Sequence, residues 1–379
     1  LAVPGPHLTG ANLTVTVRNL DGVTSTPFAY TLPANAASLD SDGDALPDAW
    51  ETVGYDANGD GVIDLDLPAL GANPYRRDVL LEVDVMNGLA NPPIASAPGV
   101  PGTFDMARAM FTAAPIISPT ANNGINLILD TSGNVPFWNI VGFNAVDNVM
   151  LSTANYGTLK AANFDNANRD NIYHYAIWGN AMPGGYSGIS DSQFDLAGNV
   201  TGPGDDFIVS FDDFPASYQS LRSQVETLVH EFGHNLGQQH GGNNNSQYKP
   251  NYWSAMSYAW QLRSGQSNAW RRQKPTCAPA YYAAAGASEP NGTLPAAISA
   301  VVDYSEGMAA SLVENTNTLS EPNGVCGQAV DWNDDGDQLD VNLNANVDDN
   351  GSAVETVTDH ANWRVLNFRG PALDGSVIP

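Results

Sequence analysis

The chain has 379 residues, and 42% of them are hydrophobic, which is enough apolar material for a globular core. Its 14 basic and 41 acidic residues give a formal net charge of -27, and because such a field repels nucleic acid and anionic membranes, we exclude both as partners. No apolar run approaches the roughly 18 residues that a membrane-spanning helix needs.

Residues 1–70 are expected to form an N-terminal extension that carries two acidic loops. An alternating stretch rich in Val and Thr, residues 13–20, predicts one strand before them. The acidic residues of the first loop stand where a calcium-binding loop has its ligands: Asp40, Asp42, Asp44, Asp48 and Glu51. Ala45 departs from this pattern, because it occupies the position that is usually glycine.

The second acidic loop has a glycine in the expected place, Gly61, but Leu67 where the final glutamate would stand. Its candidate ligands are Asp56, Asn58, Asp60, Asp64 and Asp66. Carboxylates so close together repel one another unless a cation lies between them. Both loops resemble the Asp-rich calcium loops of bacterial exoproteins and predict structural calcium, the alternative being two solvated acidic turns. Bound calcium and a surface adapted to salt would each explain the net charge.

Residues 71–240 alternate strands with helices, which predicts an α/β layer. Apolar patterns predict a helix at 103–114, a second helix at 216–237, and strands at 76–86, 125–131, 173–179 and 205–211. We expect His174, on the third of these strands, to be a hydrogen-bonded core residue. Residues 241–379 are rich in Asn, Gly and Pro, and we expect an irregular C-terminal subdomain there.

The stretch HEFGHNLGQQHGG begins at His230 and holds three of the six histidines. His230 and His234 are four residues apart on the expected helix, so both rings project from one face. Gly237 can end the helix in the left-handed conformation, and His240 can then turn back as a third ligand. Three imidazoles with an open fourth position are typical of catalytic zinc, whereas a structural zinc takes a fourth Cys or His. The segment therefore predicts a catalytic zinc site.

Glu231 directly follows the first of these ligands and is too short and wrongly angled to bind the same metal. Its carboxylate can instead reach a metal-bound water, whose pKa zinc lowers to about 7. A carboxylate in this place can take the proton and pass it to a leaving amine. The pattern therefore predicts hydrolysis of peptide bonds, with Glu231 as the general base.

The HExxHxxGxxH pattern, followed by Ser-x-Met-x-Tyr at 254–258, resembles the metzincin clan of zinc endopeptidases. The resemblance implies an α/β (α+β) fold, with a twisted mixed sheet and the active-site helix in an upper subdomain. It implies that Met256 forms an apolar floor beneath the ligands, and that Tyr258 is a switchable ligand or a transition-state donor. It also implies that the strand at 205–211 edges the cleft and pairs with extended substrate, the alternative being an ordinary interior strand.

Gly241, after the third histidine, departs from the Glu, Pro, Ser or Asp of astacins, serralysins, matrixins and adamalysins. The sequence of residues 249–258 resembles that of secreted bacterial and archaeal metzincins, close to the pappalysins. A secreted zinc endopeptidase acting on proteins or peptides is thus the leading hypothesis. The alternative is a calcium-rich extracellular adhesion module with a vestigial metal site.

Three further features complete the expectations. Asp331, Asn333, Asp335 and Asp337 form a weaker calcium candidate that is equally typical of a plain turn. The two cysteines, Cys277 and Cys326, favour one disulfide in a secreted chain, with two buried free thiols as the alternative. Because the sequence begins at Leu1 with neither Met nor a signal peptide, we expect a processed form.

Overall fold

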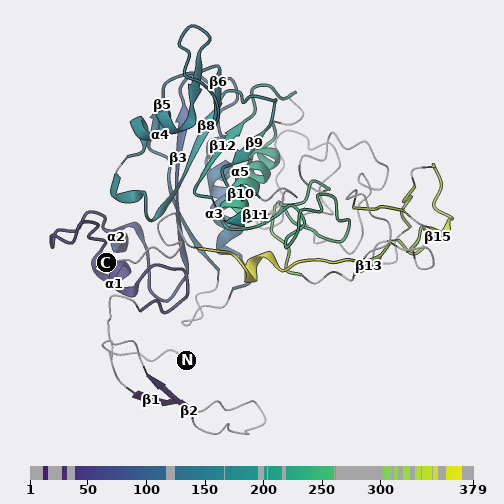
Figure 1. The fold of residues 1–379 in the computed structure, drawn as a ribbon, viewed down its shortest axis with the longest axis horizontal. Helices are drawn as coiled ribbons and strands as arrows, with labels where there is room; N and C mark the ends of the chain where they lie inside the picture. Colours follow the sequence, from purple (N-terminus) through teal and green to yellow (C-terminus); the bar gives the residue numbers. More distant parts are fainter. Residues whose placement is uncertain are drawn as a thin grey trace.

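The computed structural model describes residues 12–15, 28–31, 39–116, 124–165, 167–194, 200–202, 204–215, 219–259, 261, 302–307, 309, 311–314, 319–324, 329–333, 335–343, 345–348 and 356–368. The helices in these ranges are α1 (Asp48–Val53), α2 (Leu67–Leu70), α3 (Thr103–Thr112), α4 (Tyr156–Asn163), α5 (Leu221–Asn235) and the short 3-10 helices η2 (Ala167–Arg169) and η6 (Asn362–Arg364). Most of the regular structure lies before residue 240 (Figure 1).

A six-stranded mixed sheet forms the centre of the molecule. Its strands run in the order β4 (Asn126–Asp130), β3 (Asp78–Met86), β8 (Tyr173–Gly179), β12 (Asp206–Ser210) and β9 (Gly188–Ser190), and β5 (Asn134–Val135) also pairs with β3. Strands β4, β3, β8 and β12 are parallel, while β9 runs antiparallel to β12 and forms the edge. The chain therefore has the expected mixed α/β architecture with a mixed sheet.

One expectation about this sheet is wrong. The resemblance places the strand at 205–211 at the edge of the cleft, but β12 lies inside the sheet, between β8 and β9. Its registers place Phe207 opposite Ala176 on one side and opposite Ser190 on the other. The strand at the edge is the three-residue β9, which the apolar pattern does not reveal.

The remaining strands form two-stranded sheets. They are β1 (Asn12–Val15) with β2 (Phe28–Thr31), β6 (Ile140–Gly142) with β7 (Thr153–Asn155), β10 (Gln193–Phe194) with β11 (Val200–Gly202), β13 (Leu312–Val313) with β16 (Thr356–Val357), and β14 (Leu319–Ser320) with β15 (Val341–Leu343). In the described residues after 240, the only helix is η6 and the strands are two or three residues long. This part of the chain is irregular, as its composition predicts.

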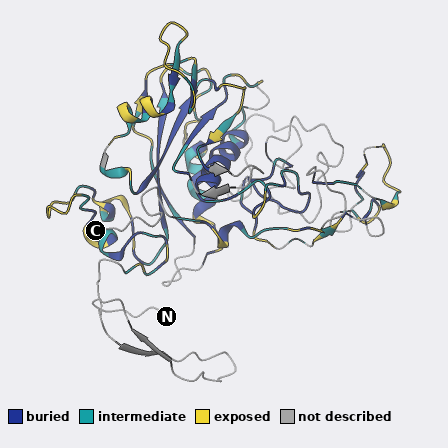
Figure 2. Cartoon of the chain, viewed as in Figure 1, coloured by how far each residue is buried: buried dark blue, intermediate teal, exposed yellow. Residues whose placement is uncertain are grey.

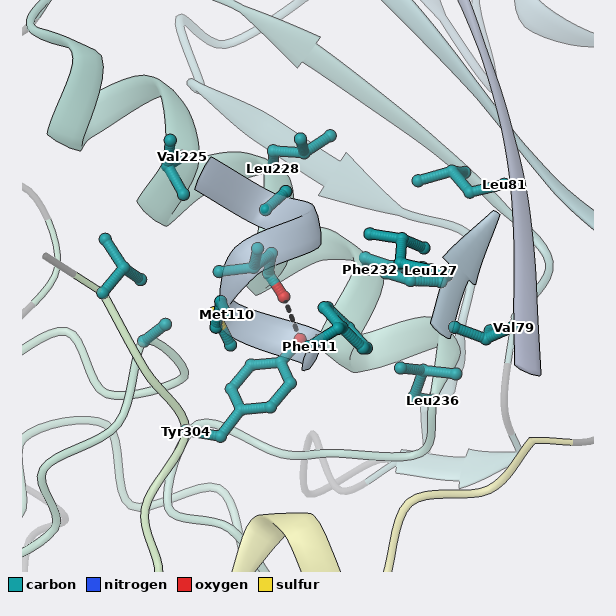
Figure 3. Packing of buried hydrophobic residues seen from close by; sticks show 14 of the residues in the cluster. Val79, Leu81, Met110, Phe111, Leu127, Val225, Leu228, Phe232, Leu236 and Tyr304 are labelled. Carbon is teal, nitrogen blue, oxygen red and sulfur yellow. Dashed lines mark hydrogen bonds between the residues drawn. The ribbon is translucent and has the colours of Figure 1, made fainter. Parts of the chain in front are cut away.

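The alternation of side chains along the strands builds two core layers. On β8, Ala176 and Trp178 belong to the cluster that contains α3 and α5, whereas Tyr175 and Ile177 pack on the side of α4. Helix α5 presents its apolar stripe to the first layer and is buried along its length (Figure 2). Figure 3 shows this layer, with residues of α5 packed among others from α3, β3 and β4: Leu228, Phe232, Leu236, Phe111, Val79, Leu81 and Leu127.

The segments on both sides of the predicted catalytic subdomain share its cores. Leu46 and Leu67, from the acidic extension, pack in one cluster with Leu80 of β3 and Tyr173 of β8. After the sheet, Met256 and Trp363 join the cluster that contains α5. The boundaries expected near residues 70 and 240 are therefore changes in secondary structure, across which the packing is continuous.

His174 lies in the core beside α5, and its ring is edge-on to Phe232 at a centroid distance of 5.2 Å. Neither of its buried ring nitrogens has a hydrogen-bond partner among the described residues, so the expectation of a hydrogen-bonded core histidine is wrong. Burial without a partner disfavours the charged imidazolium and lowers the pKa of His174 to about 4. The residue is therefore a neutral part of the apolar layer.

Candidate metal centre

Helix α5 carries the first two candidate ligands. Ser220 caps its start, since the Ser220 hydroxyl accepts a hydrogen bond from the Ser223 amide at 3.2 Å. One ring nitrogen from each of His230, His234 and His240 lies within 4.8 Å of the other two. The Nε2 atoms of His230 and His234 are 3.2 Å apart. The structure thus brings the three histidines together around one point.

Backbone carbonyls fix the orientation of the two helical ligands. His230 Nδ1 lies 2.8 Å from the carbonyl oxygen of Ala255, and His234 Nδ1 lies 2.8 Å from that of Gln238. A carbonyl can only accept, so each Nδ1 must carry the proton and donate it. Each Nε2 is then unprotonated and presents its lone pair, which is the arrangement seen in metal-binding histidines.

The third ligand is oriented by a side chain. His240 Nδ1 lies 2.7 Å from Oδ1 of Asn245, which accepts the ring proton as the two carbonyls do. Burial lowers the pKa of His234 to about 3 and also lowers the pKa values of His230 and His240. All three rings are therefore neutral at pH 7, and this donor set fits zinc. Asn245 could not be predicted from the sequence, because an Asn in an Asn-rich loop carries no distinguishing signal.

Two hydrogen bonds fix the turn that leads from α5 to His240. The chain leaves α5 through Gly237, whose φ of +82° is the left-handed conformation that glycine adopts readily. Its amide donates to the carbonyl of His234 at 2.9 Å. Nζ of the buried Lys249 donates to the carbonyl of Gly241 at 2.8 Å, next to the third ligand. Lys249 is a second positioning residue that spacing alone could not identify.

Residues that lie later in the chain pack against α5. Gly233 lies between the two helical ligands, and a Cβ at this position would come within 2.3 Å of Sδ of the buried Met256. The hydroxyl of Tyr304 donates to the carbonyl of Val229, also on α5 (Figure 3). Met256 therefore lies directly against the helix that carries the first two candidate ligands, where the resemblance places an apolar floor. Gly233 is required by this close approach, and Tyr304 was not foreseen.

Glu231 lies beside the metal centre on the same helix, and its side chain is buried. Burial raises the pKa of Glu231 to about 8, so that this carboxyl holds a proton at pH 7 until a cation on the three histidines favours the carboxylate, which is then a stronger base than that of an exposed glutamate. The edge strand β9 passes close to it, since a Cβ at Gly188 would lie 2.4 Å from Glu231 Oε1. Gly188 thus leaves the space that the carboxylate occupies.

Tyr258 stacks on two of the candidate ligands. Its ring centroid is 5.4 Å from that of His230 and 4.4 Å from that of His240. Burial, together with the nearby Glu231 carboxylate, raises the pKa of Tyr258 above its usual value. The phenol therefore keeps its proton at pH 7 and is able to donate a hydrogen bond at the metal centre.

The first acidic loop converges, but with a different set of residues from the one predicted. Asp44 belongs to two groups of close carboxylates, one with Asp40 and Asp42 and one with Glu51 and Asp78. Asp78 is the first residue of β3 and was missed, because it lies outside the loop motif. Asp48 belongs to neither group, and its two oxygens accept hydrogen bonds from the amide and hydroxyl of Ser41, both at 2.7 Å.

The second acidic loop does not gather its carboxylates in the described structure. Asp56 accepts from the amides of Gly59 and Gly61, each at 2.8 Å, and so closes a turn. The other candidates also accept backbone amides nearby: Asn58 from Asp60, Asp60 from Val62, Asp64 from Ala57, and Asp66 from Ala69 at the start of α2. No three carboxylates of this loop converge among the described residues, and its calcium ligands remain a prediction beside the alternative of solvated turns.

The third acidic loop behaves in the same way. Asp331 accepts from the amides of Asp335 and Gly336, and Asp337 accepts from that of Leu339. Asn333 donates to Asp335. Within the described residues, no three carboxylates of this loop come together. Cys277 and Cys326 lie outside the described residues, so the disulfide remains a prediction.

Comparison with known proteins adds no relative. No protein-family model matches the chain, and neither does any curated protein or solved structure. Among the described helices, none is long and apolar enough to cross a membrane. The function proposed for the chain therefore depends on the geometry of its metal centre.

Proposed function

We propose that the protein is a secreted zinc-dependent endopeptidase of metzincin type that hydrolyses peptide bonds in proteins or peptides. The observation that carries this proposal is the convergence of three neutral imidazoles, each with Nδ1 bonded to an oxygen and Nε2 unprotonated. His230, His234 and His240 would hold the ion. Glu231, with its raised pKa, lies on the same helix beside them.

The side chains around the centre have distinct tasks in such a reaction. Zinc, when bound, polarises a carbonyl and acidifies a water molecule. Glu231 accepts the proton of the attacking water and delivers it to the nitrogen of the leaving amine, so that the carboxylate is regenerated. The protonated phenol of Tyr258 donates a hydrogen bond to the oxyanion that develops on the carbonyl.

The substrate would lie along the edge of the sheet. Strand β9 has its inner side paired with β12, and it passes Glu231 at Gly188. An extended peptide that added to the outer side of β9 would be held by main-chain hydrogen bonds close to the general base. We therefore assign to β9 the substrate-pairing role that the resemblance implies for residues 205–211.

Metal removal tests the proposal. The purified protein is expected to contain stoichiometric zinc by mass spectrometry and to cleave casein or a quenched peptide library. Phenanthroline should stop the cleavage, and added zinc should restore it. A zinc-loaded protein that cuts no member of a broad peptide library would contradict the proposal and would favour the adhesion module. Mapping the cut sites in the same library gives the sequence preference.

A second prediction concerns the orientation of the third ligand. Asn245→Ala is expected to weaken zinc binding by about 10–100-fold, because losing the outer partner of a ligating histidine has an effect of this size. Competition with a chelator of known zinc affinity measures the change. Asn245→Asp keeps an acceptor for Nδ1 and should bind zinc at least as tightly as the parent protein.

The exposed neighbour Asn243 offers a matched control. Asn243→Ala removes the same chemical group from the same loop without touching the ligand, and its zinc affinity should equal that of the parent. If both alanine variants lost zinc equally, the hydrogen bond to His240 would not be the cause, and the loop as a whole would be responsible.

A further inference from the structure

Four buried carboxylates lie in two overlapping groups at the start of strand β3, well away from the histidines in the sequence. Asp42, Asp44, Glu51 and Asp78 are 8%, 1%, 2% and 1% exposed. Asp44 is common to the two groups in which carboxylate oxygens lie within 4.8 Å of one another. Three of these residues come from the loop 40–51 and the fourth from the sheet.

Two of the four side chains have no partner for their oxygens. Both carboxylate oxygens of Asp42 and both of Glu51 are inaccessible to solvent and accept no hydrogen bond of ordinary geometry within the described residues, although the Asp44 amide lies near Asp42 and the Asp78 carboxyl near Glu51. Buried charged groups are normally paired or bound to a metal, because an isolated buried charge is very unfavourable. These four oxygens therefore point to a positively charged ligand.

The remaining two carboxylates are fixed by the backbone. Asp44 Oδ1 accepts from the amide of Leu46 at 2.8 Å, and its Oδ2 accepts from the amide of Asp78 at 2.6 Å. Asp78 Oδ2 accepts from the amide of Asn73 at 2.7 Å. These bonds hold Asp44 and Asp78 rigidly, and each oxygen keeps a second lone pair for a ligand.

Basic side chains do not neutralise this group as they do two other acidic groups. Arg169 reaches Asp130 at 2.7 Å in one of those groups, and Lys160 reaches Asp206 at 2.8 Å in the other. Near the four carboxylates, Arg77 Nε donates to the backbone carbonyl of Asp42. Among the described residues, the ion pair that reaches the group is that of Arg76 with Asp78, at a long 3.9 Å. The positive charge that the group requires is therefore not supplied by these arginines.

We propose that Asp42, Asp44, Glu51 and Asp78 bind one calcium-class divalent cation, which joins the loop 40–51 to the first residue of β3. Carboxylate oxygens are the ligands that a hard cation prefers, and the absence of imidazole or thiol from the four ligands disfavours zinc. Asp40, exposed on the rim, can add a further oxygen.

Protons are the alternative occupants of the group. Burial and mutual repulsion raise the pKa values of Asp42, Asp44 and Glu51 above the usual range of a carboxyl group. Protons and a bound cation therefore compete for the group. The inference goes beyond the zinc centre, because it assigns a second metal site with its own ligands and a structural role.

The test uses the full chain and calcium chloride as the probe. Isothermal titration is expected to show calcium binding, and calcium is expected to raise the melting temperature relative to a calcium-chelated sample. Glu51→Gln and Asp78→Asn should weaken the binding by about tenfold or more, the order expected when a charged ligand is lost. Both should also reduce the calcium-dependent shift in melting temperature.

A matched control comes from Asp213, an exposed aspartate outside the acidic loops. Asp213→Asn should leave the high-affinity calcium binding unchanged. In chelator, Glu51→Gln should melt no lower than the parent, since a buried amide needs neither a proton nor a cation, and this readout shows that the variant is folded. Calcium binding that was absent from the parent, unchanged in both Glu51→Gln and Asp78→Asn, or lost in Asp213→Asn would overturn the proposal. None of these readouts uses hydrolysis, so the result is independent of the zinc centre.

Discussion

Glu231→Ala is expected to lower kcat/KM for peptide hydrolysis by a factor of about 10²–10⁴ while zinc stays bound. The three imidazoles and their outer hydrogen bonds do not involve the Glu231 side chain, so the ligand set is intact in the variant. What is lost is the buried base whose raised pKa suits it to accept a proton. Turnover of a quenched peptide and zinc content by mass spectrometry measure the two quantities separately.

Glu306→Ala is a suitable control for this prediction, because Glu306 is an exposed glutamate. It changes the net charge by the same amount and should leave both turnover and zinc content as in the parent. Comparable turnover by Glu231→Ala and the parent protein would refute the assignment of the base. Loss of zinc from Glu231→Ala would show instead that the side chain is needed to assemble the site.

Gly188→Ala is expected to lower kcat/KM by about 100-fold, with zinc retained. The added Cβ would lie 2.4 Å from Glu231 Oε1, closer than real contacts allow, so the carboxylate must move. A misplacement of about 1 Å in a reacting group can cost this much in rate. The glycine is needed for space and not for an unusual backbone angle, so the fold should persist. Steady-state kinetics and thermal melting of the variant measure both effects.

Gly179→Ala provides the matched control, since Gly179 ends strand β8 of the same sheet. A Cβ there would meet its nearest neighbour, Val141, at an ordinary 3.8 Å. The effect of Gly188→Ala should disappear in a Glu231→Ala background, where no carboxylate is left to displace. If Gly188→Ala slowed the residual turnover of that background by the same factor, the strand would act on the substrate and not through Glu231.

The helix and its ligands could be predicted because their signals are local. A helical stripe of apolar residues, a Ser cap and the spacing of His230 and His234 all lie within one short segment, and α5 (Leu221–Asn235) falls inside the predicted range. The long strands could be predicted for the same reason. Their apolar runs are buried on both faces, as β8 shows throughout its length.

The rest depended on contacts between distant parts of the chain. Strand β9 has only three residues and no pattern, so its place at the edge could not be read from the sequence. Asp78 meets Asp44 across 34 positions, a pairing that a loop motif cannot contain. In the second loop, Asp56 has the spacing of a calcium ligand, but its oxygens accept hydrogen bonds from backbone amides of their own turn. Spacing identifies candidate ligands, whereas convergence depends on the tertiary fold.

The support beneath α5 has a consequence for biosynthesis. Tyr304 bonds to the helix from a position 75 residues further along the chain, and Trp363 packs against Tyr304 later still. When His230, His234 and His240 have just left the ribosome, the nascent chain therefore still lacks the residues that pack against α5. If the proposed hydrolysis is correct, it can begin only after residues 304–363 have also been synthesised and have packed against α5.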